Sequence, residues 1–245
     1  MSRFYVPKEN VRKDEITIDG EEAHHVLDVM RMQGGDKVVV FDGTGREYTG
    51  FIKEINRRFK KIIVEIVRTE KPPAESIPEI TLAQAIPKKE KMDYIIEKAT
   101  ELGVSRVVPL VSERTVVRSD DAGCKRKVQR WQKKAIEASK QCGRASVPQI
   151  DKVTSFSEMV SRLDRYDLVL LACLTDKTVP IKKSLTGFES GKILVFIGPE
   201  GDFTPKEIRM ASVDNCKQVS LGKRVLKSDT AGLFVLAVLN YEFAI

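Results

Sequence analysis

The chain has 245 residues, of which 42% are hydrophobic and 31% are charged. This composition is that of a folded protein with one large or two ordinary domains, and it excludes an intrinsically disordered chain. The longest uninterrupted apolar run, residues 233–239, is far shorter than the roughly 20 residues that a membrane-spanning helix needs, which argues against membrane insertion.

The first residues, MSRFYVP, lack the apolar stretch of a secretory signal. The four cysteines, at 124, 142, 173 and 216, have neither the spacing of metal ligands nor the density of a disulfide scaffold. We therefore expect a cytoplasmic protein whose thiols are reduced and which holds no metal.

The net charge of +7 is concentrated in one segment. Residues 1–70 hold 13 basic and 13 acidic side chains, whereas residues 114–144 hold ten basic and three acidic ones, a difference of seven. A focused cationic surface is typical of a protein that binds a polyanion, because neutralising phosphates releases counterions. A solvated basic helix without a partner is the alternative that charge alone leaves open.

In the first 70 residues, short apolar runs at 38–41, 48–55 and 62–67 are separated by turn residues, including Asp42-Gly43-Thr44-Gly45. This pattern predicts a small β-barrel domain over residues 1–70. Two adjacent prolines, Pro72 and Pro73, cannot continue a strand ladder, so a linker is predicted at 71–79.

From residue 80 to 245, predicted strands alternate with predicted helices, which favours an α/β domain with a mostly parallel sheet. Apolar spacing predicts a helix over 92–102 that Gly103 ends. A second helix has an apolar stripe from Val128 to Cys142 and a cationic face that includes Lys127 and Lys134. The predicted strands are 80–85, 106–111, 167–172, 192–197 and 219–221.

The stretch from 231 to 243 is apolar on nearly every side of a helix. Such a helix must be covered on several sides, so we expect it either at the centre of the domain or in a subunit interface.

A glycine-bearing loop, Gly198-Pro199-Glu200-Gly201-Asp202-Phe203, follows the predicted strand 192–197. Thr204, Pro205 and Glu207 then predict a helix that starts with a capping box. Ligands of open parallel sheets bind at such strand ends, so the loop is a candidate site, although a tight structural turn would use the same glycines.

A second candidate loop, residues 222–231 (GKRVLKSDTA), follows the predicted strand 219–221. It carries cations, one acid and two hydroxyls just before the apolar helix. These polar side chains could do no more than cap that helix. A functional reading requires the two loops to lie side by side in the fold.

Several common sites lack their sequence motifs. The chain contains no G-x-G-x-x-G, no G-x-x-x-x-G-K-[ST] and no H-E-x-x-H. The histidines, His24 and His25, are adjacent and so point in different directions, which makes them a poor metal pair.

Taken together, these motifs resemble one family. Residues 197–203 (IGPEGDF) and 221–231 (LGKRVLKSDTA) resemble the two signature loops of the bacterial 16S ribosomal RNA (uracil-N3)-methyltransferases, members of the SPOUT superfamily. Further similar segments, in the same order, are 91–93, 98–103, 112–115, 130–131, 137–138 and 141–144. At the amino end, residues 3–6, Gly20 with His24 and His25, Arg31-Met32 and Gly35-Asp36 resemble the family's PUA-like RNA-binding domain.

The resemblance implies an S-adenosylmethionine-dependent enzyme that methylates N3 of a specific uridine in 16S rRNA of the small subunit. It also implies a C-terminal SPOUT-type α/β domain with a trefoil knot, a PUA-like β-barrel and a homodimer formed through the SPOUT domain. The implied cofactor-binding residues are Leu174, Thr175, Ile197, Gly198, Pro199, Glu200, Gly201, Leu221, Gly222, Leu226, Lys227, Ser228, Asp229, Thr230 and Ala231.

The chain departs from the family pattern in both loops. Asp202 stands where the family usually has a second glycine after Pro-Glu-Gly. Lys227-Ser228-Asp229-Thr230 stands where the family usually has Arg-x-Glu-Thr. Lys227 and Asp229 keep the positive and the negative charge of the family's arginine and glutamate, but on different side chains.

For catalysis, the uracil imide must lose its N3 proton and meet the activated methyl group in line. We expect Arg144 or Arg224 to stabilise the developing uracil anion, and Asp229 or Glu200 to accept or orient the proton, with loop support as the alternative for either carboxylate. The expected RNA-binding residues are Arg3, Arg31, Lys91, Arg114, Arg118, Arg130 and Arg144. A 2′-O-ribose methyltransferase of the same superfamily and a noncatalytic RNA-binding ribosome-assembly factor are the alternative functions.

Overall fold

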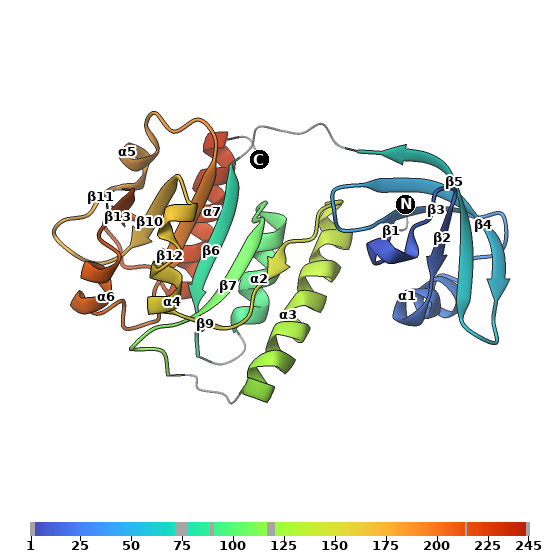
Figure 1. Ribbon diagram of the computed structural model, residues 1–245, viewed down its shortest axis with the longest axis horizontal. Coiled ribbons are helices and arrows are strands. Elements are labelled where there is room, and N and C mark those ends of the chain that lie inside the picture. The colour runs from blue at the N-terminus through green and yellow to red at the C-terminus, as the bar shows by residue number, and fades with distance from the viewer. Residues whose placement is uncertain (1–2, 72–77, 89–90, 117–120, 214, 244–245) are drawn as a thin grey trace. The chain divides into compact units, whose positions relative to one another are not determined.

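The computed structural model of the chain describes residues 3–71, 78–88, 91–116, 121–213 and 215–243 (Figure 1). It separates into two compact units, one within 1–75 and 136–147 and the other within 76–135 and 148–245. Most of the predicted linker at 71–79 lies outside the described residues, and Glu79 is already the first residue of a strand.

The first unit is a five-stranded half-barrel in the order β1-β3-β4-β5-β2. Its strands are β1(Arg3–Tyr5), β2(Glu15–Ile18), β3(Lys37–Phe41), β4(Glu47–Asn56) and β5(Lys61–Glu70). β1 runs parallel to β3, and the other pairs are antiparallel. The expected PUA-like β-domain is thus confirmed as a half-barrel, with β1 and β2 as its edges.

The core of this sheet follows the alternation of the sequence. Inward positions such as Phe4, Ile16, Val38 and Ile62 are fully buried. The predicted turn after β3 is held by Asp42, whose side chain accepts hydrogen bonds from the Thr44 N–H at 2.9 Å and the Tyr48 hydroxyl at 2.9 Å. Sequence patterning did not predict β1, β2 and the short helical turns η1(Lys8–Asn10), α1(Gly20–His24) and η2(His25–Val29).

The second unit is a parallel sheet in the order β11-β13-β10-β12-β6-β7-β8, with β9 beside β7. The strands are β6(Glu79–Ala85), β7(Arg106–Val111), β8(Gln149–Ile150), β9(Thr154–Ser155), β10(Leu168–Ala172), β11(Val179–Pro180), β12(Lys192–Ile197) and β13(Cys216–Ser220). All its strand pairs are parallel, as the alternation of strands and helices predicted.

The helices of the chain's second part lie beside this sheet (Figure 1). They are α2(Lys91–Glu101), α3(Asp121–Cys142), α4(Phe156–Val160), η3(Leu163–Arg165), α5(Ile181–Leu185), α6(Pro205–Met210) and α7(Ser228–Phe243). Residues 136–142, the last part of α3, belong to the first unit. α2 packs against α7, which contacts β6 and β12, while α4 packs against α6. Phe156, Phe196 and Phe203 join α4, β12 and the following loop in one apolar cluster.

Two details of the predicted elements were wrong. The last core strand is 216–220 rather than 219–221, because its polar residues Lys217 and Gln218 hide a half-buried strand from an apolar search. Cys142 was assigned to the apolar stripe of α3 but is exposed, since the helix ends there and Gly143 turns the backbone to φ +82°. Trp131, Ala135 and Ala138 of that stripe are buried as predicted.

α7 is buried along one face only. Ala231, Val235, Leu236 and Leu239 pack inward. On the other face, Phe234 is 38% exposed and Tyr241 is 87% exposed. The helix therefore belongs to the domain core and also presents an apolar surface to solvent.

Candidate functional site

Three loops meet at one edge of the second unit's sheet. They follow β13, β10 and β12, which are direct neighbours in the sheet, and all three strands run in the same direction. Their carboxyl ends therefore lie together, which is where ligands bind in open parallel sheets. The loop after β10 begins at Cys173, the one after β12 at Gly198 and the one after β13 at Leu221.

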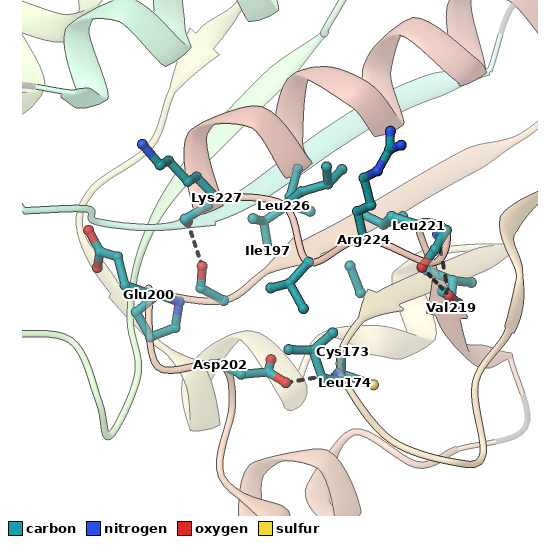
Figure 2. Close-up of a pocket in the computed structure, with 18 residues that line it drawn as sticks. Cys173, Leu174, Ile197, Glu200, Asp202, Val219, Leu221, Arg224, Leu226 and Lys227 are labelled. Carbon is teal, nitrogen blue, oxygen red and sulfur yellow. Dashed lines mark hydrogen bonds between the residues drawn. The ribbon is translucent and has the colours of Figure 1, made fainter.

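Ser228 joins two of these loops. Its hydroxyl donates a hydrogen bond of 2.6 Å to the carbonyl of Gly198 and accepts one of 2.9 Å from Nε2 of Gln84 on β6. Ser228 is 7% exposed, so both bonds are shielded from water. Figure 2 marks the bond between the two loops with a dashed line. The two loops that the sequence singled out are thus in direct contact, and the Ser228 hydroxyl bridges them rather than only capping α7.

Asp202 joins the glycine loop to the third loop. Its carboxylate accepts hydrogen bonds of 2.8 Å from the backbone N–H of Leu174 and 2.8 Å from that of Phe203. Figure 2 shows the carboxylate directed at Leu174. Asp202 has φ +60°, a left-handed conformation that glycine adopts freely and that aspartate tolerates better than most residues.

The three loops enclose a cavity of about 260 Å³ (Figure 2). Of the predicted cofactor-binding residues, those that line it are Leu174, Ile197, Gly198, Pro199, Glu200, Leu221, Gly222, Leu226, Lys227, Ser228 and Ala231. The predicted residues Thr175, Gly201, Asp229 and Thr230 are not among the lining residues. Lining residues that sequence reasoning did not assign are Ala172, Cys173, Asp202, Val219, Ser220 and Val225.

Most of the missed lining residues stand at strand ends. Ala172 ends β10 and Cys173 begins the loop after it; β10 lies between the two strands that carry the predicted loops. The signal that could have found them was the end of an apolar strand, but the sheet order that makes this strand central is not readable from the sequence.

Side chains and backbone groups of neighbouring segments hold the glycine loop in place. The Glu200 carboxylate accepts the Lys88 N–H at 3.3 Å, and the Arg114 guanidinium donates to the Gly201 carbonyl. The predicted capping box of α6 is present: Thr204 and Glu207 bond reciprocally, and Glu207 also accepts the Glu113 N–H at 2.9 Å. These contacts make Glu200 and Arg114 supports of the loop in this structure.

Asp229 stands beside the cavity at the start of α7. One carboxylate oxygen is 3.3 Å from Nζ of Lys91, the first residue of α2. The other oxygen is buried without a hydrogen-bond partner among the described residues. Because an unpartnered buried carboxylate oxygen is costly, this atom is the best candidate here for a group that acts on a ligand.

The remaining predicted site residues are spread over both units. Arg224 lines the cavity. Arg144 lies in the first unit, where its Nε donates to Ser146 Oγ at 3.2 Å and burial lowers the pKa of its guanidinium. Arg130 and the Trp131 indole both donate to Asp93 on α2, at 2.9 and 3.0 Å.

Three predicted RNA-binding cations remain, two in the first unit and one in the range of the second. Arg3 is paired with Glu47 and lies over the Phe41 ring at 5.2 Å. Arg31 is exposed and has φ +54°. Arg118 lies outside the described residues.

Two further features bear on the chemistry of the site. Burial raises the pKa of the Cys173 thiol, which lines the cavity, to about 11. Within the described ranges, no group of three or more His, Cys, Asp or Glu residues could hold a metal ion. None of the helices in those ranges is long and apolar enough to cross a membrane.

Fold and site together are those of an RNA methyltransferase with an accessory RNA-binding domain. The family model described as an RNA methyltransferase domain matches residues 74–240, and the one described as an RNA methyltransferase PUA domain matches residues 18–65. The chain belongs to the ribosomal RNA small subunit methyltransferase E family.

The curated relatives are similar over nearly the full chain. The chain is 28% identical to ribosomal RNA small subunit methyltransferase E of Bacillus subtilis, over 99% of this chain and 97% of the relative. It is 29% identical to the protein of that name from Synechocystis, over 97% of this chain and 77% of the relative.

Two solved structures with bound S-adenosylmethionine share the fold. The ribosomal RNA small subunit methyltransferase E of Neisseria gonorrhoeae superposes with a TM-score of 0.85 and is 27% identical in sequence. The match covers 99% of this chain and 98% of the Neisseria chain. A Legionella pneumophila protein superposes with a TM-score of 0.86 and is 31% identical in sequence. This match covers 98% of this chain and 97% of the Legionella chain. The resemblance drawn from the sequence motifs is thereby confirmed.

Proposed function

We propose that this protein transfers the methyl group of S-adenosylmethionine to N3 of a uridine in 16S ribosomal RNA of the small subunit. The observation that carries the proposal is the contact between the two signature loops through Ser228 and Gly198, which builds one cavity at the strand ends. The relatives named for small-subunit rRNA methylation, and those solved with the cofactor, support it.

The residues around the cavity fit the cofactor. Apolar side chains of Leu174, Ile197 and Leu226 supply a surface for an adenine ring, and the carboxylates of Glu200 and Asp202 supply negative charge for a cationic ligand. A Cβ on Gly198 would come within 3.3 Å of Asp202 Oδ1 and the Phe203 ring, which is tighter than an ordinary contact, so glycine suits that wall. When bound, the cofactor supplies an activated, electrophilic methyl group.

The chain's own task is to bind, orient and deprotonate the uracil. We assign to Arg224, which lines the cavity, stabilisation of the charge that develops on the uracil ring. Arg144 is the second candidate for that role. We assign to the unpartnered oxygen of Asp229 the role of accepting the N3 proton or of orienting the group that accepts it. The other oxygen of this carboxylate is paired with Lys91.

The RNA would be bound by exposed cations rather than by those engaged in the fold. Arg31 and the exposed side of α3, with Lys125, Arg126 and Lys134, are the cations that we assign to rRNA. Arg3 is excluded from this surface, because it is paired with Glu47. We assign the protein to the cytoplasm, where it would meet ribosomal RNA, with residues 1–70 as the RNA-binding domain and 80–245 as the methyltransferase domain. Residues 136–147 of the second range pack with the first unit, so they join the RNA-binding side of this division.

We further propose that the active form is a homodimer in which the exposed apolar face of α7 is covered by a second copy. Phe234 and Tyr241 lie seven residues apart on that face, which is the spacing of two helical turns. The trefoil knot implied by the resemblance stays a prediction.

The experiment is a methyl-transfer assay with calorimetry. The full chain is titrated with S-adenosylmethionine and then incubated with the labelled cofactor and small ribosomal subunits from cells that lack the protein. Mass analysis of the digested rRNA should show N3-methyluridine. The Asp229→Asn variant should bind the cofactor as the unchanged chain does but turn over at least about 100-fold more slowly.

Each alternative has its own outcome. A 2′-O-methylated nucleoside would replace the N3 assignment with ribose methylation. Failure to bind the cofactor would favour a noncatalytic assembly factor. Normal turnover by Asp229→Asn would remove Asp229 from the chemistry and leave it as a support of α7.

A further inference from the structure

The turn between β4 and β5 concentrates positive charge. Arg57, Arg58, Lys60 and Lys61 are four of the 13 basic residues of the segment 1–70, although that segment has no net charge. All four are exposed. We call residues 56–61 the basic hairpin.

An aromatic ring stands at the centre of the basic hairpin. Phe59 is 70% exposed, and the Arg58 guanidinium lies over its ring at 5.5 Å. The turn is shaped by its own residues: the Phe59 N–H donates to Asn56 Oδ1 at 3.2 Å, and Lys60 takes φ +46°. The ring is therefore presented to solvent by a defined turn and does not contribute to the core.

The hairpin's cations are little neutralised by the protein itself. Within the described part of the chain, the one ion pair that reaches the hairpin joins Lys60 Nζ and Asp28 Oδ2, at 3.8 Å. Asp28 is shared, because His24 Nδ1 lies 2.5 Å from the same oxygen. Arg57, Arg58 and Lys61 thus stand next to Phe59 in the sequence or two residues from it, and no described carboxylate lies within ion-pair distance of them.

We propose that the basic hairpin is a binding site for single-stranded RNA, on which an unpaired base stacks against Phe59 while the surrounding cations contact the flanking phosphates. Single-stranded nucleic acids are bound by this combination of an aromatic ring and a cationic surface, because every base has a stacking face and every linkage has a charge. The inference rests on the proposed function, since it adds a contact for the same rRNA.

The site excludes paired RNA as its preferred ligand. A base within a duplex has both faces covered by its neighbours, so it cannot stack on Phe59. The hairpin therefore selects a loop, a bulge or a strand end of the RNA. It would hold that segment independently of the residues that line the cofactor cavity.

The test measures binding of the full chain to a fluorescein-labelled, uridine-rich single strand of about 12 nucleotides by anisotropy. Phe59→Ala should weaken binding about 5- to 150-fold, the range expected for loss of one stacked base. Phe59→Leu, which keeps an apolar side chain without a ring, should behave like Phe59→Ala. Phe59→Trp should restore the affinity, and its added fluorescence should be quenched by the RNA.

Charge is tested separately from the ring. The double variant Arg57→Gln/Lys61→Gln leaves Arg58 over the ring and should reduce the slope of log affinity against log salt by ~1.4, at ~0.7 for each cation. The matched control is Lys8→Gln/Lys13→Gln, which removes two exposed cations from the same unit outside the hairpin. Its slope should stay closer to that of the unchanged chain.

The proposal and the proposed function fail in different ways. If Phe59→Ala and Phe59→Leu bind the strand as the unchanged chain does, the hairpin proposal is overturned, even when cofactor binding and methyl transfer are normal. Equal losses on single-stranded and duplex probes would also overturn it, since stacking requires an unpaired base. Absence of cofactor binding by the unchanged chain would instead sink the proposed function.

Discussion

At the scale of single residues, Ser228 carries more of the site than its size suggests. Ser228→Ala leaves both the Gly198 carbonyl and the Gln84 amide without their buried partner. We expect the free energy of unfolding to fall by about 1–3 kcal/mol and cofactor affinity to fall with it, because each unpaired buried group keeps its desolvation cost. Denaturant unfolding and calorimetry measure the two effects.

The control for this prediction is Ser157→Ala, at an exposed position of α4. It should change stability by less than about 0.5 kcal/mol. Equal effects of the two substitutions would mean that the bridge between the loops contributes nothing.

Asp202 gives a second prediction, in which the order of two variants matters. Both Asp202→Gly and Asp202→Ala remove the acceptor for the Leu174 N–H, but only alanine must also hold φ +60°. We expect the alanine variant to be about 1 kcal/mol less stable than the glycine variant, the reverse of the usual helix-interior order. Urea unfolding of both variants decides it, and an alanine variant as stable as the glycine one would contradict it.

At the scale of secondary-structure elements, α7 predicts the oligomeric state. Phe234→Glu combined with Tyr241→Glu places two charges on the exposed apolar face. A homodimer covered by this face should become a monomer, because the introduced carboxylates would be desolvated without partners. Light scattering after gel filtration measures the mass.

The control variant is Val67→Glu, at a position of β5 that is 65% exposed. It should leave the mass unchanged. A monomeric unchanged chain, or a double variant that stays dimeric, would rule out α7 as the interface.

The elements also show what the sequence could and could not predict. Long apolar strands such as β6, β10 and β12 and the amphipathic α2 follow directly from periodicity, and the capping box at Thr204 was readable residue by residue. β13 was misplaced because its burial comes from its position in the sheet rather than from its own side chains. β1 is three residues long and takes its partner from far along the chain, so no local pattern marks it.

The candidate site divides in the same way. Most residues of the two signature loops that line the cavity were identifiable, because loops after strands carry glycines and polar side chains. Cys173 and Asp202 were not, since their role depends on β10 lying between β13 and β12. The ion pair of Arg3 with Glu47 joins residues 44 positions apart, so sequence alone offered no sign that Arg3 is engaged within the fold.

At the scale of the whole molecule, two thiols predict how stability depends on pH. Burial raises the pKa of both Cys173 and Cys216 to about 11, from an ordinary value of 9.0. The folded chain therefore keeps thiol protons that the unfolded chain has lost between these values. We expect this contribution to be fully present below about pH 9 and to decline as the pH rises toward 11.

Urea unfolding from pH 7 to 10.5 tests this prediction. The Cys173→Ala/Cys216→Ala variant should lose less stability between pH 9 and 10.5 than the unchanged chain does, whatever its stability at pH 7. Tyr5 and Tyr48, whose pKa values are also raised chiefly by burial, remain in both proteins and cancel in the comparison. Parallel pH profiles would show that the thiols do not contribute.

The helix α7 contributes both to the cavity wall and to the exposed apolar face of the second unit. The amino end of α7 supplies Ser228 to the cavity wall, and further along the same helix Phe234 and Tyr241 face outward, about two and about four turns after Ser228. If a second copy covers that face and its contact shifts the amino end of α7, cofactor binding and dimerisation are coupled, and each then changes the affinity of the other by an equal factor. Dilution of the dimer to monomers would then lower the affinity for the methyl donor, although the residues that contact the donor stay the same.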